Sequence, residues 1–444
     1  MEEKIRALGK KLAFVFIVSG WLNAGYAQSG IRIEKLEDLL DYAQKHSSVQ
    51  SISAKQRELA QLTIKTAVGN VLNPRIPTAV SMIDNSKQPV SFIPADIFGG
   101  PAGTYREITM GQQYVSTLNL SPQFEILNFG NYARIQSAKI NGKVVENNAQ
   151  MAEKTLLEQV NAVYHNIVSY NAQIEILSDN RNIADSILMI VMHRYDQGLV
   201  RVQDLNETKI NKITIEDKIQ QMEASVRQQY TVLQVLCDTN EPIDITEQLN
   251  RSSLELTASV IANSDLVVRT AALQHRFMQA ELKSAKWQQL PTLSFVSNFA
   301  WQYNSNSRFF DPKANLVKSN YWGLRLNWDL PTNVNKLSAY KTAQINTHLA
   351  DISQQHSHFQ KNAENDQLET EYRKTISHYR NQQKLVALKQ ENFEKSRNQY
   401  RENILSLDKL LMAHNELILQ ESSLLNAKSA VLFAKSKIEI NNRY

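Results

Sequence analysis

The placement of proline constrains the fold of this chain more than any other feature. Nine of the ten prolines lie in two blocks, within residues 74–122 and 291–331, and Pro242 stands between the blocks. The stretches that follow the blocks, residues 123–241 and 332–444, contain no proline at all. Because proline interrupts helix interiors and central strands, these stretches leave room for long helices. The order of block and stretch occurs twice and predicts a duplicated chain.

Short sequence matches support the duplication. The segment 137–141 resembles the segment 342–346, and Tyr195 pairs with Tyr400 at the same separation (400 − 195 = 205). Several matches in the same order indicate an internal repeat, which has to be recognised before a fold is assigned.

The predicted organisation follows from these signals. Residues 1–27 have the character of a secretory signal peptide, with basic residues, a short apolar run and then small residues. A first repeat is expected over residues 28–241, a connector over 242–262 and a second repeat over 263–444. Each repeat should contain a leading helix, a β-hairpin and a long helical hairpin. The β-hairpins are expected at about 76–122 and 291–330, and the helical hairpins at about 131–238 and 335–440.

Composition excludes several classes of protein. The formal net charge of +5 is small for 444 residues, and the basic signal segment contributes to it, so no nucleic-acid partner is expected. No segment reaches the roughly 18 consecutive apolar residues of a membrane-spanning helix. Cys237 is the only cysteine, which rules out an intramolecular disulfide, and we expect it to be buried near a helix end. The sequence offers no catalytic constellation and no metal-ligand spacing, so neither an enzyme nor a cofactor is expected.

Apolar residues in the proline-free stretches recur at helical spacing. In the second stretch they fall every seven residues, at Tyr372, Tyr379, Val386, Phe393 and Tyr400, and then at Leu410, Leu417, Leu424, Val431 and Ile438. In the first stretch they alternate at spacings of four and three, at Leu156, Val160, Val163, Ile167, Tyr170, Ile174 and Leu177. Narrow seams of this kind bury against partner helices as coiled coil. The first helix would be roughly 100 Å long, and the breaks are expected at Gly198 and Asn403, since both residues tolerate a left-handed backbone.

The proline blocks have the alternating pattern of strands. Apolar or aromatic residues alternate with polar ones from Leu293 to Tyr303 and from Tyr321 to Trp328, and weaker candidate strands lie at 76–82 and 113–120. Such alternation is typical of membrane β-strands, although a half-buried soluble sheet has the same pattern. The predicted membrane-facing residues are Phe295, Phe299, Trp301, Tyr303, Trp322, Leu324, Leu326 and Trp328.

The number of strands predicts an oligomer. Two hairpins supply four strands, whereas membrane strands have to close into a barrel of at least about eight. Three copies would give twelve. The predicted fold is therefore mainly α with membrane β: a duplicated β-hairpin plus long coiled-coil helices.

With these features the chain resembles the TolC family of outer-membrane efflux proteins, over about residues 33–440. The resemblance rests on the opening helix at 36–43, on Leu127-Asn128-Phe129-Gly130 before the first long helix, and on the tip motifs at 195–204 and 400–411. It implies a homotrimer that combines a shared twelve-stranded barrel in outer-membrane lipid with an α-helical barrel in the periplasm. It also implies a passive channel that works with a periplasmic adaptor (membrane fusion) protein and an inner-membrane pump.

The resemblance further implies a gate at the helical tips, where an aspartate of the first half bonds to a tyrosine of the second half. Asp204 and Tyr400 match these two residues, and the other tip candidates are Tyr195, Gly198, Asp408, Lys409 and Met412. The chain departs from the family pattern elsewhere. The arginine expected five residues after the tyrosine is Leu405, and the expected acidic positions are Lys409 and Met412, which argues against an acidic cation-binding ring. Asp204 and Glu207 can equally be solvated charges on a helix surface.

One alternative from another class is a secreted coiled-coil scaffold or adhesin without a pore. The aromatic stripe of the second block favours the channel, because a large exposed apolar patch is a liability in water. A channel for protein export has the same architecture as one for drug efflux, and the sequence does not separate them.

Overall fold

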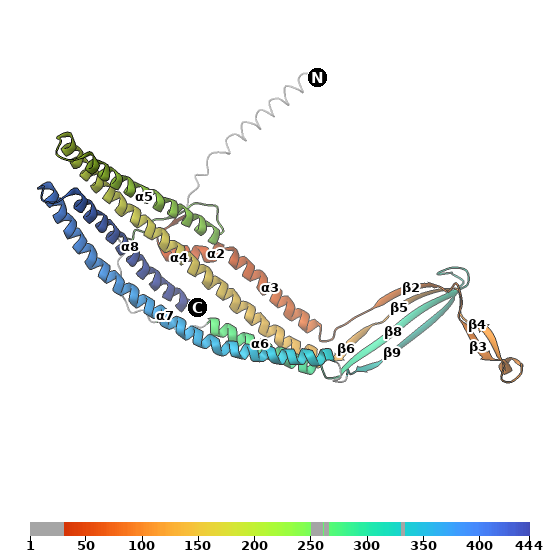
Figure 1. Cartoon of the computed structure of the whole chain (residues 1–444). Helices are drawn as coiled ribbons and strands as arrows, with labels where there is room; N and C mark the ends of the chain where they lie inside the picture. The colour runs from red at the N-terminus through yellow and green to blue at the C-terminus, as the bar shows by residue number, and fades with distance from the viewer. Residues whose placement is uncertain (1–30, 250–260, 262–265, 330–333) are drawn as a thin grey trace, which may run out of the picture. The chain divides into compact units, whose positions relative to one another are not determined.

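The computed structural model describes residues 31–249, 261, 266–329 and 334–444. The predicted signal peptide and most of the predicted connector lie outside the described residues. The chain divides into two compact units (Figure 1). Among the described residues, unit 1 comprises 31–54, 149–249, 261, 266 and 359–444, and unit 2 comprises 55–148, 267–329 and 334–358. Each unit takes segments from both predicted repeats, because the long helices run from one unit into the other.

The helices reproduce the duplication with the separation found in the sequence. They are α2 (Leu36–His46), α3 (Ser48–Gly69), α4 (Phe129–Asp196), α5 (Val202–Leu236), α6 (Leu266–Trp287), α7 (Val334–Arg401) and α8 (Leu407–Arg443). Helices α4 and α7 each have 68 residues and begin 205 residues apart (334 − 129 = 205). Helices α5 and α8 begin at the same separation (407 − 202 = 205). Of the helices that the structure describes, none combines the length and apolar character needed to cross a bilayer.

The predicted seams form the core of unit 1. The buried seam residues are Leu156, Val160, Val163, Ile167, Leu177, Tyr372, Phe393, Tyr400, Leu410, Leu417, Val431 and Ile438. Burying an apolar side chain of this size contributes about 1.5–3 kcal/mol. A short parallel pair, β1 (Ile31–Ile33) and β7 (Ile243–Ile245), packs on the same core. Cys237 is buried as expected, and this burial raises the pKa of its thiol to about 11.

The sheet of unit 2 contains five strands, which occupy four positions across its width because two short strands follow one another at one position. Its strands are β2 (Thr78–Asp84), β5 (Tyr114–Leu120), β6 (Gln123–Leu127), β8 (Thr292–Ser305) and β9 (Asn315–Asn327). The order is β2-β5-β8-β9, all antiparallel, and β6 pairs with β8 beyond the end of β5. Strand β6 was not predicted, because Pro122 separates it from β5; the Pro122 carbonyl accepts a hydrogen bond from the Ser297 amide at 2.9 Å.

A second hairpin is inserted between β2 and β5. It consists of β3 (Val90–Pro94) and β4 (Tyr105–Thr109), joined through the 3-10 turn η1 (Ala95–Phe98), and it forms a separate two-stranded sheet. The first proline block thus contains more strand than its weak alternation predicts.

Seven of the eight predicted membrane-facing residues share one face of the sheet, whereas Trp328 lies just beyond the end of β9, where its indole nitrogen donates to the Gln289 carbonyl at 3.2 Å. Directly opposed residues on neighbouring strands point to the same side, and the register places Phe295 opposite Leu324 and Trp301 opposite Leu118. Along β9 this face is open to solvent in the single chain, with Trp322 79% exposed, whereas Phe295, Trp301 and Tyr303 of β8 are half-buried. The opposite face is mainly polar and includes Ser294, Asn298, Gln302, Asn304, Arg325 and Asn327.

Candidate gate at the helical hairpin tips

The first hairpin of unit 1 turns at Gly198, as predicted. Gly198 has a φ of 70°, in the left-handed region that glycine adopts without steric cost. The Leu199 amide donates to the Arg194 carbonyl at 2.9 Å, and the Gly198 amide donates to the Tyr195 carbonyl at 2.8 Å. This pair of bonds is a Schellman motif, which satisfies carbonyls at the C-terminus of α4 that lack helical partners.

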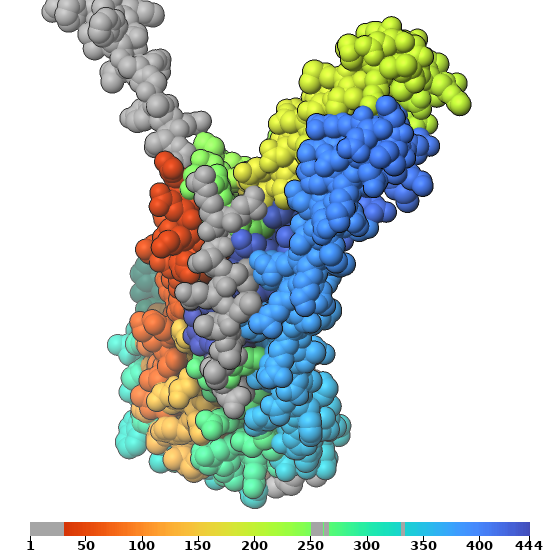
Figure 2. Space-filling model, turned by 90° about the vertical axis from the view of Figure 1, so that its left-hand side faces the viewer, coloured from red at the N-terminus to blue at the C-terminus, as the bar shows by residue number. Residues whose placement is uncertain are grey.

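The second hairpin turns through the same motif, with asparagine in place of glycine. Asn403 has a φ of 62°, the Ile404 amide donates to the Gln399 carbonyl at 2.8 Å, and the Asn403 amide donates to the Tyr400 carbonyl at 3.1 Å. The predicted break at Asn403 is therefore confirmed. The two tips lie side by side in both views (Figures 1 and 2).

Tyr400 fills the apolar core between the tips. Its side chain is 4% exposed and packs with Val191, Leu205 and Phe393. Burial raises the pKa of the Tyr400 hydroxyl, and the nearby charge of Arg194 partly opposes this shift. Among the described residues, the hydroxyl has no hydrogen-bond partner.

The structure does not join Asp204 to Tyr400 within one chain. The Asp204 carboxylate instead accepts a hydrogen bond from the Arg201 amide at 3.0 Å. It thereby satisfies a donor at the start of α5, where a negative charge also interacts favourably with the helix dipole.

Arg194 provides the contact between the tips that sequence analysis missed. Its guanidinium carbon lies 4.6 Å from the centre of the Tyr400 ring, and its Nη2 donates to the carbonyls of Tyr400 at 3.3 Å and Arg401 at 3.1 Å. A signal for Arg194 was present, because this residue precedes Tyr195 in the tip motif and its repeat counterpart is the neutral Gln399 (194 + 205 = 399).

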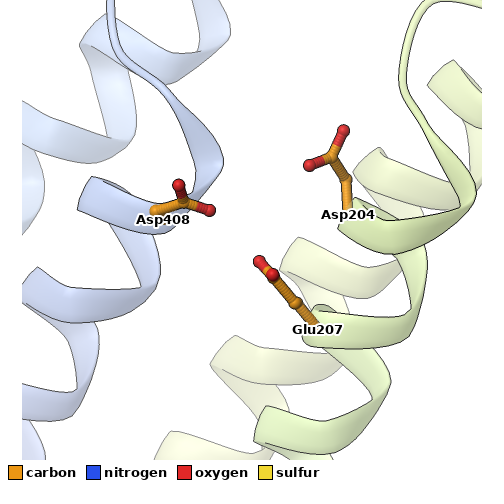
Figure 3. A group of neighbouring side chains, drawn as sticks. All are labelled: Asp204, Glu207 and Asp408. Atoms are coloured by element: carbon orange, nitrogen blue, oxygen red, sulfur yellow. The ribbon is translucent and has the colours of Figure 1, made fainter.

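Three carboxylates from two helices meet beside the tips. Asp204 and Glu207 of α5 face Asp408 of α8 (Figure 3), and one oxygen from each lies within 4.8 Å of the others. The hydrogen-bonding contact with Asp408 is the main influence that raises the pKa of Glu207. Close carboxylates of this kind share a proton or offer oxygen ligands to a hard cation. Glu207 and Asp408 are both exposed, so the cluster lies at the solvent-facing surface of the tips.

The remaining tip candidates are exposed and take no part in this cluster. Tyr195 is 40% and Met412 63% exposed, and Lys409 is exposed as well.

Comparison with known proteins identifies the fold. No family model and no curated protein matches the sequence. Solved structures do match. The outer membrane protein VceC from Vibrio cholerae has a TM-score of 0.72 at 16% identity, with 92% of this chain and 96% of that chain covered. The outer membrane channel CmeC from Campylobacter jejuni has a TM-score of 0.72 at 14% identity, with 91% and 85% covered. The open state of the MtrE outer membrane channel from Neisseria gonorrhoeae has a TM-score of 0.70 at 12% identity, with 92% and 89% covered.

The likeness extends over nearly the whole of each chain. The structure therefore has the TolC-like fold of outer-membrane channels, as the sequence resemblance predicted. These structural neighbours are channels rather than enzymes.

Proposed function

We propose that this protein is the outer-membrane channel of a tripartite efflux or export system. It would be a homotrimer and a passive conduit, supplied by a periplasmic adaptor and an inner-membrane pump, without enzymatic activity of its own. The observation that carries this proposal is the sheet of unit 2, whose aromatic face lies open while its opposite face is polar. That arrangement suits a barrel wall between lipid and a water-filled lumen.

The edges of the sheet support assembly with further copies. In the described part of the chain, β2 and β9 each pair on one side only. Because neighbours in the order β2-β5-β8-β9 are antiparallel, β2 and β9 run in opposite directions. Strand β9 of one copy can therefore pair with β2 of the next, and three copies would close twelve strands without leaving backbone groups unsatisfied in lipid.

The helices of unit 2 have matching edges. Contacts give the layer order α3, α4, α6, α7: Arg57 to Glu146 (2.7 Å), Ser284 to the Gly130 carbonyl (3.3 Å) and Thr347 to the Met278 carbonyl (3.2 Å). The two edge helices carry exposed apolar ridges, Leu59 and Leu62 on α3, and Ile345, Leu349 and Ile352 on α7. Packing one ridge against the other from copy to copy would remove both from water.

The alternative of a secreted scaffold or adhesin has no support from the comparisons. It would also leave the aromatic face of the sheet in water. The proposal covers drug efflux and protein export alike, because channels of both kinds share this architecture.

Reconstitution tests the proposed function. We expect the mature protein to require detergent for extraction from the outer-membrane fraction, to migrate with the mass of three chains, and to form ion-conducting pores in planar lipid bilayers. The polar face of the sheet should make these pores water-filled. Recovery as a stable monomer without detergent would contradict the proposal.

We also propose that the hairpin tips form the gate of this channel, with the carboxylate cluster as its pH-dependent part. A raised pKa in the folded protein means that the contact of Glu207 with Asp408 is fully present below the usual carboxyl range and is lost as pH rises through the raised pKa. Repulsion among the charged groups should then separate α5 from α8.

We therefore expect pore conductance to increase as pH rises above the usual carboxyl range of about 4, and Glu207→Gln to reduce this increase. Glutamine keeps a hydrogen-bond donor for Asp408 and removes the charge. Bilayer recordings across this range make the measurement. Glu223→Gln, an exposed change on the same helix, is the matched control and should respond as wild type does. Identical pH responses of Glu207→Gln and wild type would contradict the role of the cluster.

A further inference from the structure

We propose that Arg194 is the latch of the closed gate, a positioning residue that holds the tip of the first helical hairpin against the C-terminal end of α7. This inference rests on the proposed gate and names the contact that keeps it closed.

The contact joins two rigid pieces of backbone. The Arg194 carbonyl is itself an acceptor in the Schellman motif that ends α4, and the Tyr400 carbonyl is an acceptor in the motif that ends α7. The Arg194 side chain donates a second hydrogen bond to the Tyr400 carbonyl and also donates a hydrogen bond to the Arg401 carbonyl. One side chain therefore joins the end of α4 to the end of α7, and the tips cannot separate without breaking its two hydrogen bonds.

The charge of Arg194 is directed at α7. In the part of the chain that the structure describes, no carboxylate forms an ion pair with Arg194. The guanidinium instead faces terminal carbonyls, where the helix dipole places partial negative charge, and covers the ring of Tyr400. Because the Tyr400 ring is buried, packing fixes its position under the guanidinium group.

The second hairpin tip has no counterpart of the Arg194 contact. The repeat counterpart of Arg194 is Gln399, which carries no charge, so the second tip has no equivalent side chain to hold α4. Loss of this single residue should therefore free the tips.

The latch differs from the Asp204–Tyr400 lock in its use of Tyr400. It needs the ring and the main-chain carbonyl, whereas the lock needs the hydroxyl, which has no partner among the described residues. Tyr400→Phe keeps the ring and the carbonyl, so the latch predicts wild-type behaviour and the lock predicts opening.

Bilayer recordings of four variants test the latch. Arg194→Gln should shift the ratio of open to closed dwell times roughly tenfold towards open, as expected for the loss of charge-assisted hydrogen bonds. Arg194→Lys should give a partial rescue, because lysine keeps the charge but lacks the planar fork that stacks on the ring. Arg401→Gln removes an equal charge from the facing tip but keeps the main-chain carbonyl, and it should match wild type, as should Tyr400→Phe.

A second readout separates failure of the latch from failure of the proposed function. Spin labels at Leu199→Cys and Ile404→Cys, both exposed tip positions, report the separation of the tips in the purified protein whether or not it conducts. Arg194→Gln should lengthen and broaden the measured distance distribution, and Arg194→Lys should do so less. Unchanged distances and dwell times in Arg194→Gln, or an equal effect of Arg401→Gln, would overturn the latch. Absence of conductance in wild type would overturn the channel instead, and the distances would still decide the latch.

Discussion

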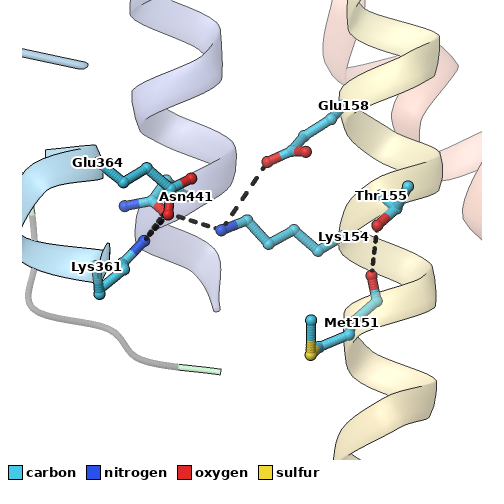
Figure 4. Close-up of polar contacts among 7 residues, drawn as sticks. All are labelled: Met151, Lys154, Thr155, Glu158, Lys361, Glu364 and Asn441. Atoms are coloured by element: carbon cyan, nitrogen blue, oxygen red, sulfur yellow. Dashed lines mark hydrogen bonds and ion pairs between the residues drawn. The ribbon is translucent and has the colours of Figure 1, made fainter. Parts of the chain in front are cut away.

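Replacing Asn441 by leucine is expected to lower the free energy of unfolding by about 3–5 kcal/mol. The Asn441 side-chain oxygen accepts hydrogen bonds from the ammonium groups of Lys154 and Lys361, each at 2.8 Å (Figure 4). Lys361 has a side chain only 5% exposed, and the carboxylates nearest to the two lysines are more distant, with Glu364 at 3.6 Å from Lys361 and Glu158 at 3.9 Å from Lys154. Burial, followed by the charge of Lys361, lowers the pKa of Lys154. Leucine would leave two desolvated like charges without their shared acceptor.

Chemical denaturation in detergent, followed by far-UV circular dichroism, measures this effect. Asn441→Asp is the matched control, because its carboxylate keeps the acceptor and balances the positive charges, so it should be at least as stable as wild type. The double variant Asn441→Leu with Lys361→Met should recover part of the loss, since it removes one of the two like charges that shared the Asn441 oxygen. Equal stability of Asn441→Leu and wild type would show that the hydrogen bonds to the Asn441 oxygen do not stabilise the folded protein.

The helices could be predicted from the sequence because their signals are local. The absence of proline and the seven-residue spacing fixed both long hairpins, and the separation of 205 residues between repeats recurs in the structure without change. The breaks at Gly198 and Asn403 were predictable for the same reason, since only the backbone of these residues matters there. The alternation of β8 and β9 likewise predicted which side chains share a face.

The contacts between the two tips could not be predicted from periodicity, because each joins residues about 200 positions apart. Arg194 reaches the end of α7 and Glu207 faces Asp408 only through the rotation and offset of packed helices, which periodicity does not specify. The Asp204–Tyr400 bond that the resemblance implies is not formed within one chain. Asp204 stands in the first turn of α5, where its carboxylate caps the helix.

Lowering the pH from about 6.5 to about 4 is expected to reduce the free energy of unfolding by about 3 kcal/mol for each of two buried histidines. His165 of α4 contacts the Ser436 hydroxyl at 3.2 Å, and His414 of α8 contacts the Asn180 side-chain oxygen at 3.1 Å. Among the described residues, the Nδ1 atom of each ring has no partner. Burial lowers the pKa of both rings to about 4.

The sign of this effect follows from proton binding. The unfolded chain takes up these protons near pH 6.5, whereas the folded protein takes them up only near pH 4. The free energy of unfolding therefore decreases as the pH is lowered from about 6.5 to about 4, and these histidines cause no further decrease below that range. Glu421, which accepts a hydrogen bond from Asn180 at 2.8 Å, has a pKa raised by burial and contributes with the opposite sign.

The contribution of one histidine is therefore measured as the difference in pH dependence between its variant and wild type. Denaturation of His414→Gln at both pH values should show a loss smaller than that of wild type by about 3 kcal/mol, whereas the exposed change His356→Gln should leave the loss unaltered. Because the two rings bridge α4 and α8 rather than lie on the surface, an equal pH dependence in His414→Gln and wild type would mean that the ring is already open to water in the folded protein.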